Sequence, residues 1–318
     1  RHADVILPPP TALQKEHYDV SLYTFAIRNV ANFSERVLEL PADQPDEWQI
    51  LAKLGGILQG LGAEVSAEDI DDSILRQSVG AAVATVGSPV HGRDADEIFD
   101  ILSADGRSGP ARQIDLMLQT GPYGAGFGAN PGGLSLQVLL DNPHGVDLGA
   151  LEPRLPEAMR TTDGRINLAP PLFLAEMERL AGKKHEMENA GVLLVGRRDL
   201  KSNNSWMHNL RVLTKGSLSC TLHVHPDDAA GLGVATGSVV RVTSRVGSVD
   251  VTAEVTDSVR PGVVSLPHGW GHNVPGTRMA VAAEKAGVNS NILTDDRTLD
   301  PLSGNAALNA IPVTLQAL

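Results

Sequence analysis

One segment of this sequence holds more hydrogen-bonding side chains than a connecting loop needs. Residues 196–209 contain three basic side chains, three asparagines, two serines, one histidine and one tryptophan. Arginine suits phosphate oxygens, amides suit the edges of a ring, and tryptophan offers a plane for stacking or packing. The segment follows the apolar run Val192–Val195, which is typical of a buried strand. A polar loop without a ligand is the plainer interpretation, but the position at a strand end favours a site for a phosphate-bearing heterocycle.

Two further segments have the same character. Residues 266–273 read Leu-Pro-His-Gly-Trp-Gly-His-Asn, so glycines flank Trp270 and would let a ligand approach the backbone closely. Residues 289–296 place polar groups around a short apolar step. Two of the three tryptophans, Trp206 and Trp270, lie in these polar segments of a chain with only 3% aromatic residues. That concentration indicates a site rather than general core filling.

A metal site is the weaker interpretation of the histidine pair at His223 and His225. The two residues lie two apart on a predicted strand, so both rings would face one side and could ligate a metal. No third ligand is fixed by the spacing, and the run that starts at His225 equally fits the end of a strand before a capped short helix. We therefore expect no metal ligand in this chain.

No group of residues predicts a nucleophile or a dinucleotide fingerprint. Ser205, His208 and Asp199 could be drawn as a hydrolytic triad, but a chain with ten histidines offers many such triples, and no G-x-S-x-G turn is present. The glycine-rich residues 121–133 give G-x-G-x-G with Pro131 where the third glycine belongs. We expect a flexible surface loop there and assign no catalytic residue.

The composition narrows the class of protein. The chain has 318 residues, 42% of them hydrophobic, which suits about two folded domains. A net charge of −12 argues against a general nucleic-acid binder, although a local basic pocket remains compatible with it. No apolar run is long enough to cross a membrane. The single cysteine, Cys220, excludes an intrachain disulfide, a cysteine-held zinc site and a cysteine-held iron–sulfur cluster within the chain.

The N-terminal half predicts irregular structure followed by helices. Residues 1–45 contain strand-like pieces, among them Val5–Leu7 as the tail of a buried strand, and residues 46–120 are mostly helical. The helical prediction rests on three signals: an apolar face made by Leu51, Leu54, Leu58 and Leu61, a helix start at Ser66, and Pro110 in a first turn. Further on, we expect a strand around residues 166–168 and a short helix over residues 172–180.

After about residue 190 the sequence predicts a small closed β barrel. Short apolar or alternating runs recur with turn residues between them: Val192–Val195, Cys220–Val224, Val239–Thr243, Val249–Val255, Val263–Leu266 and Ile311–Leu315. Residues 245–247 suit a hairpin turn. Strands this dense are typical of a barrel.

The order of these segments resembles the C-terminal portion of molybdopterin oxidoreductases, the group that includes formate dehydrogenases, nitrate reductases and dimethyl sulfoxide reductases. The motifs that carry the resemblance follow in sequence: Leu193–Arg197 with the loop to His208, His225–Ala229 with Leu232 and Gly233, Gly237 to Gly247, Pro261-Gly262, His268–Trp270, Asn291–Thr294 and Asp300–Gly304. Residues Ala3–Pro8 are similar to the strand that leaves the middle domain of these enzymes.

The resemblance implies a fold and a division into domains. Residues 1–150 would be the C-terminal part of a Rossmann-like α/β domain, mostly helical and truncated at its start. Residues 151–190 would be a connection, and residues 191–318 a six-stranded double-psi β barrel that binds a molybdopterin dinucleotide. The chain begins Arg1-His2 without a methionine or leader, and we expect it to be a piece of a longer protein.

The resemblance also implies which residues hold the cofactor, a molybdopterin guanine dinucleotide with molybdenum or tungsten. They are Gly196, Arg197, Asn204, Ser205, His208, Asn209, His268, Gly269, Asn289 and Asn291. The metal ligand and any iron–sulfur cluster would lie upstream. The chain would therefore be part of an oxidoreductase, for example one that oxidises formate or reduces an oxyanion, and inactive alone.

Several alternatives stay open. The expected partners are the upstream domains and an electron-transfer subunit, without nucleic acid, and the expected location is the cytoplasm. A non-enzymatic binding or assembly module is the second hypothesis, with the acidic helical part as a docking surface. An autonomous small-barrel hydrolase or decarboxylase is a third hypothesis, and it lacks a convincing nucleophile.

Overall fold

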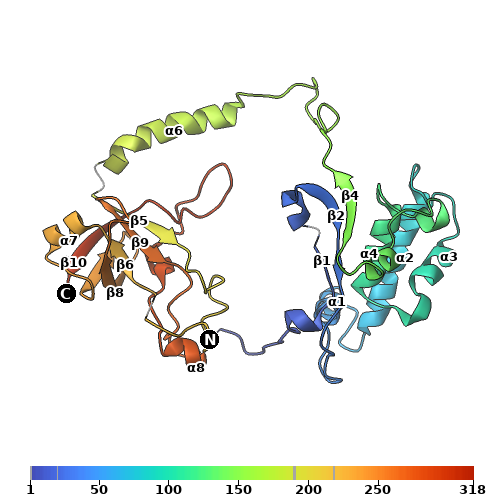
Figure 1. Cartoon of the computed structure of the whole chain (residues 1–318), viewed down its shortest axis with the longest axis horizontal. Coiled ribbons are helices and arrows are strands. Elements are labelled where there is room, and N and C mark those ends of the chain that lie inside the picture. The colour runs from blue at the N-terminus through green and yellow to red at the C-terminus, as the bar shows by residue number, and fades with distance from the viewer. Residues whose placement is uncertain (1, 20, 189–190, 218) are drawn as a thin grey trace. The chain divides into compact units, whose positions relative to one another are not determined.

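A computed structural model describes residues 2–19, 21–188, 191–217 and 219–318 (Figure 1). The chain divides into two compact units, Ala3–Ala158 and Met159–Leu318. Among the described residues, no helix is long and apolar enough to cross a membrane. Helices followed by a barrel confirm the predicted fold class. The domain limits at residues 150 and 190 and the Rossmann-like assignment stay predictions.

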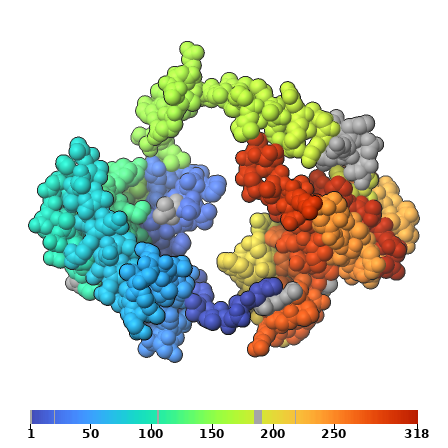
Figure 2. Space-filling view, turned by 180° about the vertical axis from the view of Figure 1, so that it is seen from behind, coloured from blue at the N-terminus to red at the C-terminus, as the bar shows by residue number. Residues whose placement is uncertain are grey.

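The first unit is built mainly of helices, as the sequence predicts, and packs into one continuous body (Figure 2, blue to green). Three caps start its first three helices, because the side chains of Asp46, Ser66 and Asp94 accept hydrogen bonds from backbone N–H groups. Pro110 occupies the first turn of the fourth helix. The helices are α1 (Glu47–Leu58), α2 (Ala67–Ala84), α3 (Ala95–Leu102), α4 (Pro110–Thr120) and α5 (Leu136–Leu140).

Two small antiparallel sheets flank these helices. Strand β1 (His17–Tyr18) pairs with β3 (Phe33–Ser34), and β2 (Arg28–Ala31) pairs with β4 (Val146–Ala150). One apolar core joins α2, α3 and α4 around Leu75, Ile98 and Leu102, and a second joins β2, β3 and α5 around Phe33 and Leu139. Short 3₁₀ turns complete the unit: η1 (Ala12–Gln14), η2 (Leu22–Phe25), η3 (Ala104–Gly106) and η4 (Gly126–Gly128).

Two apolar segments are exposed where the sequence predicts burial. Residues Val5–Leu7 form no strand, because no described strand lies beside them to pair with, and their side chains are exposed. The leucine face of α1 (Leu51, Leu54 and Leu58, with Leu61 beyond its end) is also exposed. Helix α1 packs on α2 through Gly56 instead, where an added Cβ would lie 2.7 Å from Ile70 Cδ1. A glycine lets the two helices approach closely, and this turns the leucines outward.

The glycine-rich residues 121–133 form a largely exposed segment at the surface, as predicted, and its flexibility stays a prediction. Backbone hydrogen bonds join Ala125 N to Leu134 O and Leu134 N to Tyr123 O. A Cβ on Gly124 would lie 2.2 Å from the carbonyl oxygen of Gln119. Gly124 therefore serves close backbone packing.

The second unit contains the closed barrel. Every strand predicted after residue 190 is present: β5 (Val192–Arg197), β6 (Leu222–Val224), β7 (Val239–Thr243), β8 (Ser248–Val255), β9 (Val263–Pro267) and β10 (Ile311–Ala317). They pair in the order β10-β5-β9-β6-β8-β7 and close through β7 and β10. Alternate residues such as Val240 and Val242 fill the interior. The strand expected around residues 166–168 is absent, since Ile166 and Leu168 are exposed in a segment without ladder partners.

The short helix predicted over residues 172–180 is longer in the structure, where α6 covers Pro171–Glu188. Two further helices, α7 (Pro226–Leu232) and α8 (Ala280–Ala283), and the 3₁₀ turn η5 (Ser290–Leu293) lie in the connections between strands.

Strand direction brings the long connections to one end of the barrel. Strand β5 runs parallel to β9, and β7 runs the same way because both β7 and β5 are antiparallel to β10. The carboxyl ends of β5, β7 and β9 therefore share one end with the start of β6, β8 and β10. The connections 198–221, 244–247 and 268–310 all lie at this end, which we call the loop end.

The helical unit depends on a buried ion pair, which gives a test of its stability. Asp71 accepts hydrogen bonds from Gly109 N at 2.6 Å and from the buried guanidinium of Arg112. Replacing Asp71 by Ala leaves buried donors unpaired, and we expect a loss of about 3 kcal/mol in the free energy of unfolding of this unit. Urea titration followed by circular dichroism measures it. Asp96→Ala, which breaks the exposed Arg76–Asp96 pair, is the control and should cost less than about 1 kcal/mol.

Candidate functional site

Every predicted binding residue lies at the loop end of the barrel. Gly196 and Arg197 end β5, residues 204–209 lie in the connection to β6, and residues 268–291 lie in the connection to β10. The sequence shows polar segments at strand ends, and the strand directions show why these segments meet. Their contacts with a cofactor stay predictions.

Arg197 binds protein oxygens rather than projecting to solvent. Its terminal nitrogens donate to the carbonyl oxygens of Ser265 at 2.6 Å, Thr221 at 2.8 Å and Ser219 at 3.3 Å. Burial lowers the pKa of its guanidinium, with Glu254 acting in the opposite direction. Arg197 therefore joins β5 to β9 and to the residues that lead into β6, and a phosphate would have to compete with these carbonyls.

Glycines let the connections pack directly on one another. Gly269 has a φ of +87°, and a Cβ there would lie 2.0 Å from the carbonyl oxygen of Asn204. Gly271 meets Asn289 in the same way at 2.7 Å. Asn204 itself has a φ of +64°, a conformation that asparagine tolerates better than most residues. Close packing thus brings Gly269 against Asn204 and Gly271 against Asn289.

A buried aromatic cluster lies under these connections. The ring of His208 stacks on Trp270 with centroids 3.9 Å apart, and His208 Nδ1 lies 2.8 Å from His272 Nε2. Burial lowers the pKa of both histidines. One ring nitrogen, Trp270 Nε1, is buried without a hydrogen-bond partner among the described residues. His272 completes the cluster and was not predicted, although it lies in the quoted segment 266–273.

Three further contacts join the two long connections. Asn209 Oδ1 accepts hydrogen bonds from Val281 N and Ala282 N at the start of α8, both at 3.1 Å. Arg211 and Glu284 form an ion pair at 2.8 Å. Lys285 Nζ donates to the carbonyl oxygens of Thr214 and Gly216. His208 and Asn209 are therefore used to hold the connections together, a role that their residue types did not reveal.

The other predicted residues keep hydrogen-bonding groups toward solvent. Asn204 is exposed and accepts from Arg198 through Oδ1, while Ser205 and His268 are partly exposed. Asn289 caps η5, because its Oδ1 accepts a hydrogen bond from the backbone N–H of Asn291. The side chain of Asn291 is exposed. We call Asn204, Ser205, His268 and Asn291 the outward polar set. Trp206 is 77% exposed, whereas Trp270 is only 8% exposed, so the two tryptophans have opposite roles.

Gly196 is fixed by a residue that sequence reasoning missed. Its backbone N–H donates to Asn309 Oδ1 at 2.8 Å. Nothing in the sequence around Asn309 marks this contact, because it joins the end of β5 to the residues before β10. The contact places Gly196 next to the first of two cavities at the loop end.

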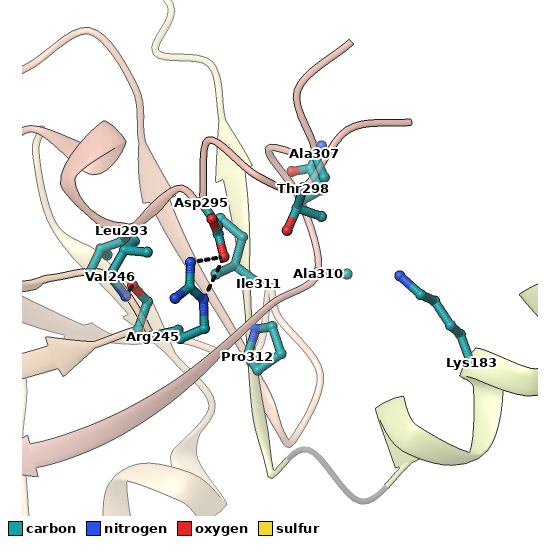
Figure 3. Close-up of a pocket in the computed structure, with 12 residues that line it drawn as sticks. Lys183, Arg245, Val246, Leu293, Asp295, Thr298, Ala307, Ala310, Ile311 and Pro312 are labelled. Atoms are coloured by element: carbon teal, nitrogen blue, oxygen red, sulfur yellow. Dashed lines mark hydrogen bonds and ion pairs between the residues drawn. The ribbon is translucent and has the colours of Figure 1, made fainter. Parts of the chain in front are cut away.

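Two cavities open at the loop end. The larger, about 340 Å³, lies between the β7–β8 hairpin and residues 293–312. Figure 3 shows Arg245 and Asp295 paired at its edge and Lys183 extending from α6 toward it. The smaller, about 260 Å³, lies against His208 and Trp270 and carries three lysines.

Two of the histidines in the weaker sequence patterns, His225 and His208, make structural contacts. His225 caps α7 by accepting a hydrogen bond from Asp227 N. His208 pairs with His272, and no hydrogen bond joins its ring to Ser205 or Asp199 in the described part of the chain. Residues 2–19, 21–188, 191–217 and 219–318 contain no cluster of three metal-ligating side chains.

The sequence similarity to known proteins falls on the barrel. Residues 192–312 match the sequence profile described as molydopterin dinucleotide binding domain. The molybdopterin-containing subunit of arsenate respiratory reductase from Chrysiogenes arsenatis is 34% identical over 121 residues, which cover 36% of this chain and 14% of that subunit. Biotin sulfoxide reductase from Cereibacter sphaeroides is 50% identical over 46 residues, which cover 14% of this chain and 6% of the reductase.

The structural comparison extends beyond the barrel. Acetylene hydratase from Pelobacter acetylenicus aligns over 98% of this chain and 38% of the hydratase, with a TM-score of 0.50 and 18% sequence identity. This likeness concerns the fold. The chain spans only a small part of the length of the curated relatives that it matches.

The close contact at Gly269 can be tested by adding one methyl group. Gly269→Ala places a Cβ against the Asn204 carbonyl at a positive φ, so we expect the barrel unit to lose about 3 kcal/mol or more of stability. Gly237→Ala is the matched control, because its φ is +96° and nothing lies within 4 Å of its Cβ. It should cost about 1–2 kcal/mol. Equal losses, measured by urea unfolding in a Trp48→Phe, Trp206→Phe background so that Trp270 alone reports, would contradict the packing argument.

The buried histidines predict a pH dependence of stability. Because burial lowers the pKa of His208 and His272, the unfolded chain binds protons more readily than the folded chain in mild acid. The free energy of unfolding should therefore decrease as the pH falls below about 6.5, the ordinary histidine value. His272→Gln should make this decrease smaller, and His144→Gln, an exposed change in the helical unit, should not. Urea titrations between pH 8 and pH 5.5 measure the slopes.

Proposed function

We propose, from the match of residues 192–312 to the molydopterin dinucleotide binding domain, that the chain is the cofactor-holding C-terminal part of a molybdenum or tungsten oxidoreductase. The cofactor of this proposal is a molybdopterin guanine dinucleotide, and the double-psi connectivity of the barrel belongs to the same proposal. Arsenate respiratory reductase and biotin sulfoxide reductase are relatives whose names state a reduction, the first of an oxyanion and the second of a sulfoxide. Reduction of an oxyanion is therefore the favoured reaction class, with formate oxidation as another.

The observation that carries the proposal is the outward polar set on a fixed base. Asn204, Ser205, His268 and Asn291 come from two connections that Gly269, His208 and Asn209 hold together. Amide, hydroxyl and imidazole groups can pair with the edges of a pterin or guanine ring, which present alternating donors and acceptors. A rigid support under such groups is what a binding site for a polar heterocycle requires.

The described residues fit a phosphate-linked dinucleotide in a second respect. A cavity lined by Lys201, Lys215 and Lys285 lies at the same end of the barrel. When bound, the cofactor supplies the metal centre for a two-electron redox reaction. This chain would bind and orient it through the outward polar set and would not be catalytic alone.

The remaining parts of the enzyme are also proposed. The metal ligand and any iron–sulfur cluster would come from upstream domains, and an electron-transfer subunit would be a partner. The proposed location is the cytoplasm.

A non-enzymatic assembly module is the second candidate. The exposed leucines of α1 favour it, because an exposed apolar face suits a protein partner. It predicts no saturable binding of a pterin dinucleotide.

The proposal is tested by titrating the chain with isolated molybdopterin guanine dinucleotide and following tryptophan fluorescence. We expect saturable binding, with Asn291→Ala raising Kd about five- to tenfold, because one or two hydrogen bonds are lost. Asn142→Ala removes an exposed asparagine of the helical unit and should leave Kd unchanged. Asn209→Ala should mainly reduce stability, since this residue caps α8. Absence of saturable binding in the unaltered chain would support the assembly module instead.

A further inference from the structure

A cavity in the helical unit is lined by every tyrosine of the chain. It has a volume of about 290 Å³ and lies between the paired strands β2 and β4 and the end of α4 (Figure 1). The sequence contains three tyrosines, and Tyr18, Tyr23 and Tyr123 all line this cavity. They come from β1, η2 and the connection after α4. None of them is fully buried, so these rings form a surface that a ligand can reach.

A β-bulge shapes the wall opposite the end of α4. Strands β2 and β4 shift register between Asn29, which pairs with Gly149, and Val30, which pairs with Asp147. Leu148 is therefore the extra residue on β4, and it lines the cavity. A bulge interrupts the ladder and redirects a side chain, and bulges are frequent beside binding sites. The cavity is thus part of the construction of the sheet.

The charged and amide groups at the cavity are already paired within the protein. Arg28 is the only charged lining residue among those described. Its Nε donates to both carboxylate oxygens of Asp147, at 3.1 Å and 2.9 Å. Asn29 Nδ2 donates to the carbonyl oxygen of Ala150 at 3.0 Å. The cavity therefore offers no unpaired charge to a guest, and an uncharged ligand fits it best.

Two phenol hydroxyls remain without a partner. The Tyr23 hydroxyl accepts from Asn32 N at 2.6 Å and donates to Asn32 O at 2.9 Å, so it is fully used. The hydroxyls of Tyr18 and Tyr123 form no hydrogen bond with any described residue. Burial, and then the neighbouring Tyr23, raise the pKa of Tyr18, so this phenol stays protonated at neutral pH. A protonated phenol can both donate and accept.

The walls also have the geometry that an aromatic guest requires. The rings of Tyr18 and Tyr23 meet edge to face, with centroids 5.7 Å apart and an interplanar angle of 87°. Leu118, Leu134 and Met117 supply apolar surface beside them. Aromatic rings pack well edge to face or with an offset. A cavity of about 150 Å³ holds benzene, so this one has room for a substituted ring.

We propose that this cavity binds a small uncharged aromatic ring that carries an oxygen substituent, as a phenol does. The rings of Tyr18 and Tyr123 would pack on the guest, and their hydroxyls would pair with its oxygen. The proposal does not depend on the proposed function, because all of its residues belong to the helical unit and the dinucleotide is assigned to the barrel.

The test is a titration of the whole chain with 4-fluorophenol, followed by fluorine NMR of the ligand. We expect saturable binding at about millimolar concentration. Tyr18→Phe and Tyr123→Phe keep the rings and remove the free hydroxyls, and each should raise Kd about three- to tenfold through the loss of one hydrogen bond. Tyr23→Phe is the matched control, because it removes the same atom from the same cavity. Its hydroxyl is already bound to Asn32, so Kd should stay within about twofold.

A second ligand separates hydrogen bonding from ring packing. 4-Fluorotoluene lacks the hydroxyl and should bind about three- to tenfold more weakly than 4-fluorophenol. Neither Tyr18→Phe nor Tyr123→Phe should change its Kd by more than about twofold. Circular dichroism establishes that each variant is folded. Absence of saturation by about 10 mM 4-fluorophenol, equal Kd values for the two ligands, or an effect of Tyr23→Phe as large as the other two would each overturn the proposal.

The phenol ring can come from a free compound or from a tyrosine side chain of a polypeptide. Competition against 4-fluorophenol decides between these sources. If 4-methylphenol displaces it at a lower concentration than N-acetyltyrosine amide, the cavity takes a free aromatic compound. The reverse order assigns it to a tyrosine side chain, and both results support an aromatic site.

Discussion

The hydrogen bonds of the Arg197 guanidinium hold together the segments that meet at the loop end of the barrel. A cation that is partly withdrawn from water needs its donors satisfied, and those of the half-buried Arg197 bind carbonyl oxygens on β9 and on the residues before β6. Three neighbouring segments are thereby fixed at the point where β5 ends. Parallel pairing of β5 with β9 then starts both long connections from the same place. The polar loops converge because the strands that lead into them are held together there.

Polar residues in these loops have two different tasks. His208, His272 and Asn209 bind other parts of the loops, and Gly269 and Gly271 let backbone meet backbone. The outward polar set has few internal partners and remains available to a ligand. A site that orients a large heterocycle needs both kinds, because exposed amides on a loosely held loop would lose conformational entropy on binding. Many of the polar residues in 196–209 thus hold the loops together, and only some of them remain available to bind a ligand.

Much of the barrel could be predicted, because local sequence determines it. The alternation of residues in Val239–Thr243 predicts a strand and shows which of its faces is buried, and the turn after it predicts the hairpin with the next strand. The roles of Arg197 and Asn209 could not be predicted, since residue type gives the capacity to donate or accept and the partners lie far away along the chain. The same limit applies to the leucine face of α1, where Gly56 decides which side packs on α2. Trp206 and Trp270 have similar sequence settings and opposite burial.

The local charge at the loop end differs in sign from the net charge of the whole chain. The acidic surface repels anions at long range, but this field is screened within about 8 Å at physiological salt. Inside the smaller cavity three lysines, Lys201, Lys215 and Lys285, face one acidic residue, Asp199, among the described lining residues. Charges this close to one another outweigh the screened charge of the distant surface, because the interaction energy falls with distance. The local potential at the loop end is therefore set by its own lysines and not by the net charge of the chain.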